Sequence, residues 1–266
     1  YNMNSLVSFD SPNVILYGSP GTGKTYTVKT TIDIICQGNQ DLYEFVQFHP
    51  SYTYKDFIEG IKPKGVTENG NIRFELVNGI FKEFCIKAKN NPSNNYYFIV
   101  DEINRANLSA VFGETLSLLE SGYRHQVNPI DTQSDEPKQG ISDNLIKTQY
   151  SSLLDSLITE DSCYESLAYE IIKDKSGKKS VRFGIPSNLY FIGMMNDVDK
   201  SIDAFDLALR RRFTWIRKDC DYDVIESHTQ LANGEEFTNI ANYKKCAEKL
   251  NEYINKDLGL GSSYEF

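Results

Sequence analysis

The sequence predicts an α/β fold in which a buried parallel sheet carries a phosphate-binding loop, and two observations support this. The run Gly18–Thr25 (G-S-P-G-T-G-K-T) fits the pattern G-x-x-x-x-G-K-[ST] and lies between an apolar run at 14–17 and a helical stretch at 26–36. Two further runs, Tyr96–Val100 and Leu189–Met195, are continuously apolar, as strands buried on both faces of a parallel sheet require. Both runs end in polar residues, at the edge where such sheets place their ligands.

Residues 18–25, here called the phosphate loop, have the chemistry of an anion site. Glycines let successive N–H groups point at one phosphate, and the helix that follows adds positive potential. We expect Lys24 to reach the β- and γ-phosphates of a nucleoside triphosphate and the Thr25 hydroxyl to bind Mg²⁺. The predicted nucleotide-binding residues are Gly18, Ser19, Pro20, Gly21, Thr22, Gly23, Lys24, Thr25 and Tyr26.

Composition indicates a folded, acidic protein of one large domain, or of a large and a small one. The 266 residues suffice for a sizeable core, and 17 Tyr with 15 Phe argue against disorder. A formal net charge of -9 argues against broad nucleic-acid binding by this chain alone, although a local basic pore could exist in an assembly. The abrupt start at Tyr1 suggests an excised piece of a longer protein.

Cysteine usage and the apolar runs bear on the compartment. Five widely spaced cysteines without C-x-x-C, and three scattered histidines, give no zinc pattern. The odd cysteine count and the lack of a signal peptide indicate the cytoplasm. Runs such as 189–195 are too short to cross a bilayer, so we expect no membrane contact.

The elements after the first helix follow from local patterns. Tyr43–Phe48 is predicted to be a strand, and His49–Phe57 a loop that opens a short helix. That loop fits either a pore or nucleotide-edge role or simple aromatic packing. Asn69-Gly70 predicts a hairpin tip, and Asn78 is predicted to cap a helix with an apolar stripe.

Two carboxylates follow the buried run at 96–100. Asp101 is predicted to order the Mg²⁺ shell, and Glu102 to polarise an attacking water. A strand that ends in Asp-Glu carries little information by itself. Its position after a phosphate loop favours this role over an ordinary acidic loop.

The middle of the chain has a different character. Asn107 is predicted to cap a helix with apolar spacing from 108 to 119. Residues 121–180 are polar and rich in turn signals, and we interpret them as an insertion with a helical patch at 146–157 and a hairpin at 175–179. The lysines of that hairpin fit either a solvated turn or contact with a nucleic-acid backbone.

Polar groups also follow the last apolar run. Asn196 stands where it could reach the attacking water and the γ-phosphate. Arg210–Arg212 are costly to bury together, so we expect them to face a neighbour's phosphates or carboxylates rather than form a solvated corner. A strand is predicted at 213–216. Beyond 219 a helical stripe predicts a small helical domain: Tyr243, Cys246, Ala247, Leu250, Tyr253 and Ile254.

Five stretches together resemble the AAA+ superfamily, and within it the McrB family of GTP-dependent restriction motors. They are G-S-P-G-T-G-K-T (18–25), V-Q-F-H-P-S-Y-T-Y-K-D-F (46–57), D-E-I-N-R-A-N-L-S-A-V-F-G-E (101–114), M-N-D-V-D-K-S (195–201) and A-L-R-R-R-F (208–213). The phosphate loop alone fits a very large superfamily. The second and third runs are much narrower and carry the resemblance, which covers most of residues 14–216.

The resemblance implies a five-stranded parallel sheet with helices on both faces, at 1–218 with an insertion at about 121–180. It implies a small helical lid at 219–266, which we expect to be incomplete because the family continues with a run like I-G-H-S-Y-F. It implies a ring, expected to be a hexamer, with Mg²⁺ and nucleotide between subunits. The implied catalytic residues are Glu102 (Walker B), Asn196 (sensor 1), and Arg211 or Arg212 as a finger in trans, with Thr25 and Asp101 as metal ligands.

The implied activity is hydrolysis of GTP, rather than ATP, by the motor of a DNA restriction and antiviral defence system. Such rings act with an McrC-type nuclease subunit and typically carry an N-terminal DNA-reading domain, and we expect this sequence to be the motor part alone. An ATP-dependent remodeller resembling MoxR-type chaperones, or a nucleotide-gated scaffold with little turnover, are the alternatives. The base preference rests on resemblance, because Asn196-x-x-Asp199 only superficially matches the guanine-reading N-K-x-D motif. Lys200 replaces the arginine of the family's M-N-T-A-D-R-S, which removes a bidentate fork that a partner-stimulated step could use.

Overall fold

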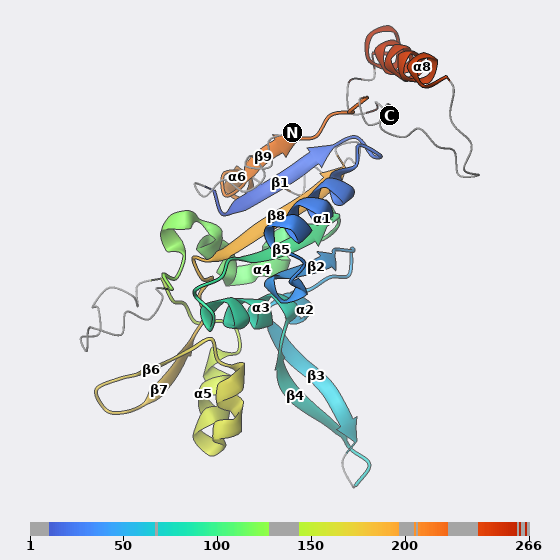
Figure 1. Cartoon of the computed structure of the whole chain (residues 1–266). Coiled ribbons are helices and arrows are strands. Elements are labelled where there is room, and N and C mark those ends of the chain that lie inside the picture. The colour runs from blue at the N-terminus through green and yellow to red at the C-terminus, as the bar shows by residue number, and fades with distance from the viewer. Residues whose placement is uncertain are drawn as a thin grey trace.

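A five-stranded parallel sheet forms the centre of the protein (Figure 1). The computed structural model describes residues 11–66, 69–127, 144–196, 205, 207–222, 239–259, 261 and 264. The strand order is β2-β5-β8-β1-β9, and all four pairings are parallel. The predicted α/β fold is therefore confirmed. The strands are β1 (Asn13–Gly18), β2 (Tyr43–Gln47), β5 (Tyr96–Asp101), β8 (Leu189–Asn196) and β9 (Thr214–Arg217).

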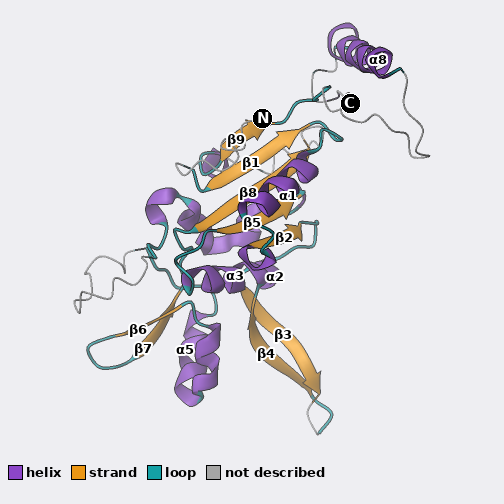
Figure 2. Ribbon diagram, in the orientation of Figure 1, coloured by secondary structure: helices purple, strands orange, loops and turns teal. Residues whose placement is uncertain are grey.

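Helices cover both faces of this sheet (Figure 2). Successive side chains of a strand point to opposite faces, so the sheet supports two clusters. One cluster joins Leu16, Ile99 and Ile192 to helix α1 (Lys24–Ile35). The other joins the opposite face to α2 (Tyr54–Phe57), α3 (Ile80–Lys89) and α4 (Leu108–Phe112).

The second cluster is built largely of phenylalanines. Phe57 stacks on Phe81 with ring centroids 4.6 Å apart, and Phe81 meets Phe98 edge-on at 4.9 Å. Phe98 in turn stacks on Phe191 of the next strand at 5.8 Å. Each such pair adds about 0.5–1.5 kcal/mol beyond the burial of its area. The short helix α2 is thereby fixed to the middle of the sheet.

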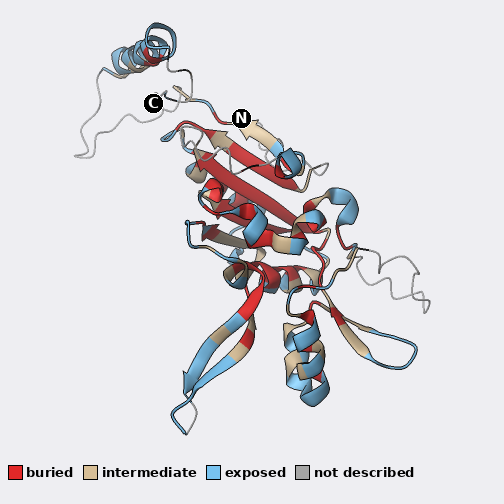
Figure 3. Ribbon diagram, turned by 180° about the vertical axis from the view of Figure 1, so that it is seen from behind, coloured by how far each residue is buried: buried red, intermediate tan, exposed pale blue. Residues whose placement is uncertain are grey.

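Three further elements project together from one end of the sheet (Figure 3). They are the hairpin β3 (Glu59–Val66) with β4 (Ile72–Asn78), helix α5 (Ser151–Glu160), and the hairpin β6 (Glu170–Lys173) with β7 (Lys179–Arg182). We call them the projecting unit. They share a small core of their own, made by Leu76, Leu154, Ile158 and Val181. Both predicted hairpins are confirmed.

Two predicted helical patterns end differently from expectation. The spacing from 108 to 119 continues past α4, but Gly113 has φ 53° and the chain goes on as a 3₁₀-helix, Gly113–Leu119. Ile146 lies outside α5 and pairs with Phe183 instead. The predicted cap Asn78 is wrong: it is the last residue of β4 and donates to the Leu167 carbonyl, and Gly79 is the N-cap of α3.

The C-terminal part contains α6 (Leu207–Arg210), α8 (Ile240–Glu252) and a π-helical turn, Tyr253–Asp257. Most of the stripe predicted to pack, including Tyr243 and Leu250, is exposed, while Ile254 is buried. The domain boundary at 218 and the incomplete lid stay predictions. None of the helices in the described residues has the length and apolar character that crossing a membrane needs. The remaining short 3₁₀-helices are Gln40–Leu42, Ile103–Arg105, Ser121–Tyr123 and Ser162–Leu167.

A buried arginine ties three distant segments of the sheet layer together. Arg124 is 2 % exposed and donates to the carbonyls of Leu119 and Leu189 and to Asn13 Oδ1. These acceptors are neutral, and burial lowers the pKa of Arg124 to about 10. The guanidinium thus supplies hydrogen-bond donors to buried acceptors at the first residues of β1 and β8. Its own desolvation opposes this gain.

Replacing Arg124 with alanine should lower the free energy of unfolding by on the order of 3 kcal/mol, because it removes three buried hydrogen bonds and opens a cavity. Urea denaturation followed by circular dichroism measures this. Arg73→Ala is the matched control: Arg73 is 61 % exposed and pairs with Glu75 at the surface, so its loss should cost at most about 1 kcal/mol. Equal midpoints for the two variants would contradict the role given to Arg124.

Candidate functional site

The predicted site residues gather at the carboxyl edge of the sheet. The phosphate loop follows β1, Asp101 and Glu102 follow β5, and Asn196 ends β8. β1 and β8 are neighbours in parallel register, with Gly18 opposite Asn196. Three separate parts of the sequence thus meet at one edge, as the pattern of strand ends predicts.

The phosphate loop is an open cradle. Gly21 and Gly23 have φ of 83° and 78°, where a side chain is strained, and among the described residues no atom lies within 4 Å of a Cβ built on either. Thr22 Oγ1 donates to the Ser19 carbonyl over 3.0 Å and closes the turn. The glycines are therefore required by the curl of the backbone, whose N–H groups can face an anion.

Lys24, the first residue of α1, lies inside the curl of the loop. It is only 7 % exposed, and its Nζ donates to the carbonyls of Gly18 at 2.9 Å and Ser19 at 2.6 Å. A cation and a helix N-terminus together favour a bound anion there. Tyr26 is different: its side chain is exposed and lines a cavity of about 740 Å³ between α1 and β2, whose lining includes no residue of the phosphate loop.

The two predicted metal ligands lie side by side. Thr25 Oγ1 donates to Asp101 Oδ2 over 3.3 Å, and the Glu102 N–H donates to Asp101 Oδ1 over 3.0 Å. A hydroxyl and a carboxylate are hard oxygen ligands of the kind Mg²⁺ takes, with waters and phosphate oxygens completing its shell. The residues present fit a magnesium ion at this point.

Glu102 stands on a strained backbone. Its φ of 51° and ψ of 42° are left-handed, which costs a non-glycine residue roughly 1–3 kcal/mol. Asn196 Nδ2 donates to its Oε1 over 3.2 Å, and Arg105 Nε lies 3.4 Å from its Oε2. The strained turn therefore holds the carboxylate between groups from β8 and from the next 3₁₀-helix.

Sequence reasoning missed Arg105 and the packing that supports this turn. Arg105 lies inside the quoted run 101–114, and its spacing of three from Glu102 was the available signal. Ile103 is fully buried against Gly193, where a Cβ would come within 2.8 Å of the Ile103 side chain. Only glycine at 193 lets the residue after Glu102 approach the sheet this closely.

The two predicted finger arginines lie at the opposite edge of the sheet from the phosphate loop. They precede β9, whose first residue, Thr214, pairs with Val14, four residues before Gly18, or about 13 Å along the strand. Arg212 is 10 % exposed and pairs with Glu120 at 2.9 Å, whereas Arg211 is 69 % exposed and 3.7 Å from the same carboxylate. The structure does not bring either arginine to the loop of its own chain. Lys200 lies outside the described residues.

A comparison with known families gives a match over residues 13–213 to the AAA domain (dynein-related subfamily). The chain belongs to this AAA domain family. The match runs from the first residue of β1 to the residue before β9, and it includes every site residue described above. As an AAA domain with an intact phosphate loop, the chain is a P-loop nucleoside triphosphatase and binds nucleotide.

Two curated relatives are subunits of restriction enzymes. The chain is 33% identical over 247 residues to the Type IV methyl-directed restriction enzyme EcoKMcrB subunit of Escherichia coli (strain K12), covering 92% of this chain and 44% of that protein. It is 28% identical over 229 residues to the Type II restriction enzyme BsuMI component YdiS of Bacillus subtilis (strain 168), covering 76% and 56%. The chain thus spans about half the length of these relatives. The predicted resemblance to McrB-type AAA+ proteins is confirmed.

Replacing Gly23 with alanine should weaken nucleotide binding by about tenfold, because a side chain at this left-handed φ costs roughly 1–2 kcal/mol and the loop must relax away from the phosphates. Titration with a fluorescent nucleotide measures the affinity. Gly122→Ala is the control, since that glycine also has open space around a Cβ but no positive φ. An unchanged affinity in Gly23→Ala would remove the loop curl from the binding site.

Proposed function

We propose that this AAA domain is the nucleotide-hydrolysing part of a ring motor in a DNA restriction system, with GTP as its nucleotide. The observation that carries the proposal is the contact between Asn196 and Glu102, placed beside the Thr25–Asp101 pair at the mouth of an open phosphate loop. This is the arrangement that phosphoryl transfer to water requires: a cradle, a metal position, a base and a polar group to orient the base.

In this proposal each residue has one task. The loop N–H groups and Lys24 bind the phosphates, and Thr25 and Asp101 hold Mg²⁺, which neutralises phosphate charge when bound. Glu102 accepts a proton from the attacking water, while Asn196 fixes the Glu102 carboxylate and can donate to the γ-phosphate. The 3.2 Å contact keeps that carboxylate at the sheet edge rather than in solvent.

The position of Arg211 favours catalysis across a subunit boundary. The arginine and the phosphate loop lie at opposite edges of adjacent strands, so a head-to-tail arrangement would bring the Arg211 of one subunit to the loop of the next. A closed ring, for which we propose six subunits, repeats this contact. Arg212 is held by Glu120 and is the poorer candidate for the finger.

The partners are proposed from the relatives. Similarity to restriction-enzyme subunits supports an McrC-like nuclease as the subunit that the motor serves, with DNA bound through that partner or through a domain outside this chain. The choice of GTP over ATP rests on the resemblance to the McrB family. Five free thiols support a cytoplasmic protein.

Phosphate release should be faster with GTP than with ATP and should rise steeply with protein concentration, because the trans arginine acts only in the assembly. A coupled phosphate assay over a concentration series measures this. Glu102→Gln should keep nucleotide affinity and lose turnover by at least about 100-fold, whereas Glu160→Gln, at the exposed end of α5, should match the wild type. Faster turnover with ATP would instead support a MoxR-like remodeller. Binding without turnover, even after the nuclease subunit is added, would support a scaffold.

Arg211→Ala should bind nucleotide normally but lose at least about 1,000-fold in turnover, the size of a trans arginine effect. Mixing it with Glu102→Gln should restore activity, because some boundaries then combine an intact Glu102 with a neighbour's intact Arg211. The phosphate assay on mixtures of varied ratio tests this. Activity no higher than that of either variant alone would place Arg211 outside the neighbour's site.

A further inference from the structure

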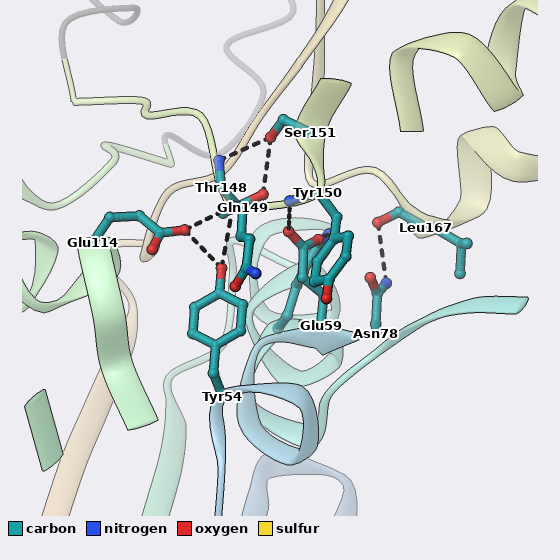
Figure 4. A network of polar contacts seen from close by, with 10 residues as sticks. Tyr54, Glu59, Asn78, Glu114, Thr148, Gln149, Tyr150, Ser151 and Leu167 are labelled. Carbon is teal, nitrogen blue, oxygen red and sulfur yellow. Dashed lines mark hydrogen bonds and ion pairs between the residues drawn. The ribbon is translucent and has the colours of Figure 1, made fainter. Parts of the chain in front are cut away.

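A polar joint connects the projecting unit to the body of the sheet (Figure 4). It contains residues of the runs 46–57 and 101–114, which carry the family resemblance. These particular residues have no role in the proposed phosphate chemistry. Tyr54 comes from the first run and Glu114 from the second. Both meet the segment that leads into α5, at Gln149.

On one side of the joint, Glu114 accepts two hydrogen bonds at the same oxygen. The Tyr54 hydroxyl donates to Glu114 Oε1 over 2.7 Å, and the Gln149 N–H donates to it over 2.9 Å. Burial, then the Glu114 hydrogen bond, raise the pKa of Tyr54, so the phenol stays a donor. Helix α2, the 3₁₀-helix Gly113–Leu119 and the segment that leads into α5 therefore meet at one carboxylate oxygen.

On the other side, a second carboxylate accepts the next N–H along the chain. The Tyr150 N–H donates to Glu59 Oε1 over 3.0 Å, and Glu59 Oε2 pairs with Lys82 of α3 at 2.5 Å. Both side chains of this ion pair are buried. Two consecutive N–H groups at the N-terminus of α5 thus each bind a carboxylate, which also suits the positive end of that helix.

Gly113 fixes how Tyr54 reaches the joint. With φ 53°, a Cβ at this position would lie 3.1 Å from two carbons of the Tyr54 ring. The ring thus packs on the glycine backbone, and its hydroxyl meets the side chain of the next residue. This explains why Gly113 interrupts the helical spacing at a point where the sequence favours a continuous helix.

Short, packed segments link Tyr54 and Glu114, the two partners of the hydrogen bond described above, to the candidate site. Phe48 N–H donates to the Asp101 carbonyl over 2.9 Å, and Phe48 stacks on Tyr52, two residues before Tyr54. Glu114 follows Glu102 through α4, whose Phe112 packs on Phe57 of α2 at 4.8 Å. Two series of contacts therefore run from the strained Asp101–Glu102 turn, one to Tyr54 and one to Glu114, and they meet at Gln149.

We propose that Tyr54 and Glu114 are positioning residues that couple the nucleotide site to the projecting unit, by holding the N-terminus of α5 in a state that depends on bound nucleotide. The inference rests on the proposed function, since it needs nucleotide at the phosphate loop. The coupling is reciprocal: a partner that moves the projecting unit changes nucleotide affinity by the same factor. A purely structural joint would hold α5 equally well with and without nucleotide.

Hydrogen exchange of the peptides that cover 146–160 tests the coupling, with and without saturating GTP in the Glu102→Gln background. In that reference protein we expect GTP to change exchange at Gln149 and Tyr150 by about fivefold or more, the lower end of ordinary site-to-site coupling. Adding Glu114→Gln should abolish the change, and adding Tyr54→Phe, which keeps the ring on Gly113, should reduce it. Adding Glu165→Gln is the control, because Glu165 pairs with Lys179 of β7 at the surface and is not part of the joint.

The same samples are titrated with GTP so that the two proposals fail separately. No binding to the reference protein would overturn the proposed function and the coupling with it. Binding without any change at 149–150 would overturn the coupling alone. So would a response to GTP that survives both variants, or exchange that Glu114→Gln raises equally in the free and bound states, as a structural joint requires.

Discussion

The position of β1 between β8 and β9 determines the geometry of the rest. Its carboxyl end carries the phosphate loop, its neighbour β8 brings Asn196 level with Gly18, and its other neighbour β9 begins level with Val14. Because all three strands are parallel, groups that follow a strand and groups that precede one are separated by its full length. Glu102 and the Thr25–Asp101 pair are therefore kept at one end of the strands, and the arginines at the other. Within one chain the arginines stay away from the phosphate loop, which is why the proposed catalysis uses an arginine of a second subunit.

The strain at Glu102 is sustained by the packing next to it. A left-handed glutamate persists only where its surroundings over-determine it. Ile103 is fully buried against Gly193, and the Asp101 carboxylate accepts the Glu102 N–H. Because the residues on both sides of Glu102 are fixed, its side chain points away from the sheet and meets Asn196 and Arg105. The turn thus joins the Asp101 carboxylate directly to the backbone of the segment that follows.

The sequence predicts the strands and the carboxyl-edge residues because their signals are local. A continuous apolar run and a polar end suffice for β5 and β8, and the phosphate loop has its own spacing. Signals fail where the deciding partner is far along the chain. Arg124 donates to acceptors at residues 13, 119 and 189, and the sequence around position 124 does not predict these partners. α4 ends at Gly113, where the Tyr54 ring packs on the glycine backbone. Asn78 donates to the Leu167 carbonyl instead of capping the helix beside it. Arg212 likewise pairs with Glu120, which lies far earlier in the chain.

The joint at the start of α5 gives a structural role to the far ends of the runs 46–57 and 101–114, which carry the family resemblance. Phosphate chemistry constrains a few residues at a strand end, whereas the runs 46–57 and 101–114 extend well past Gln47 and Glu102. Their far ends meet again at Tyr54, Gly113 and Glu114, after leaving the sheet at adjacent strands whose ends are bonded through Phe48 and Asp101. Two segments joined at both ends form a closed frame of contacts. Both arms of this frame end at Gln149, so the proposed coupling has two contiguous series of packed contacts to follow rather than one. The two runs are long enough to reach from the Asp101–Glu102 turn to the segment that leads into α5.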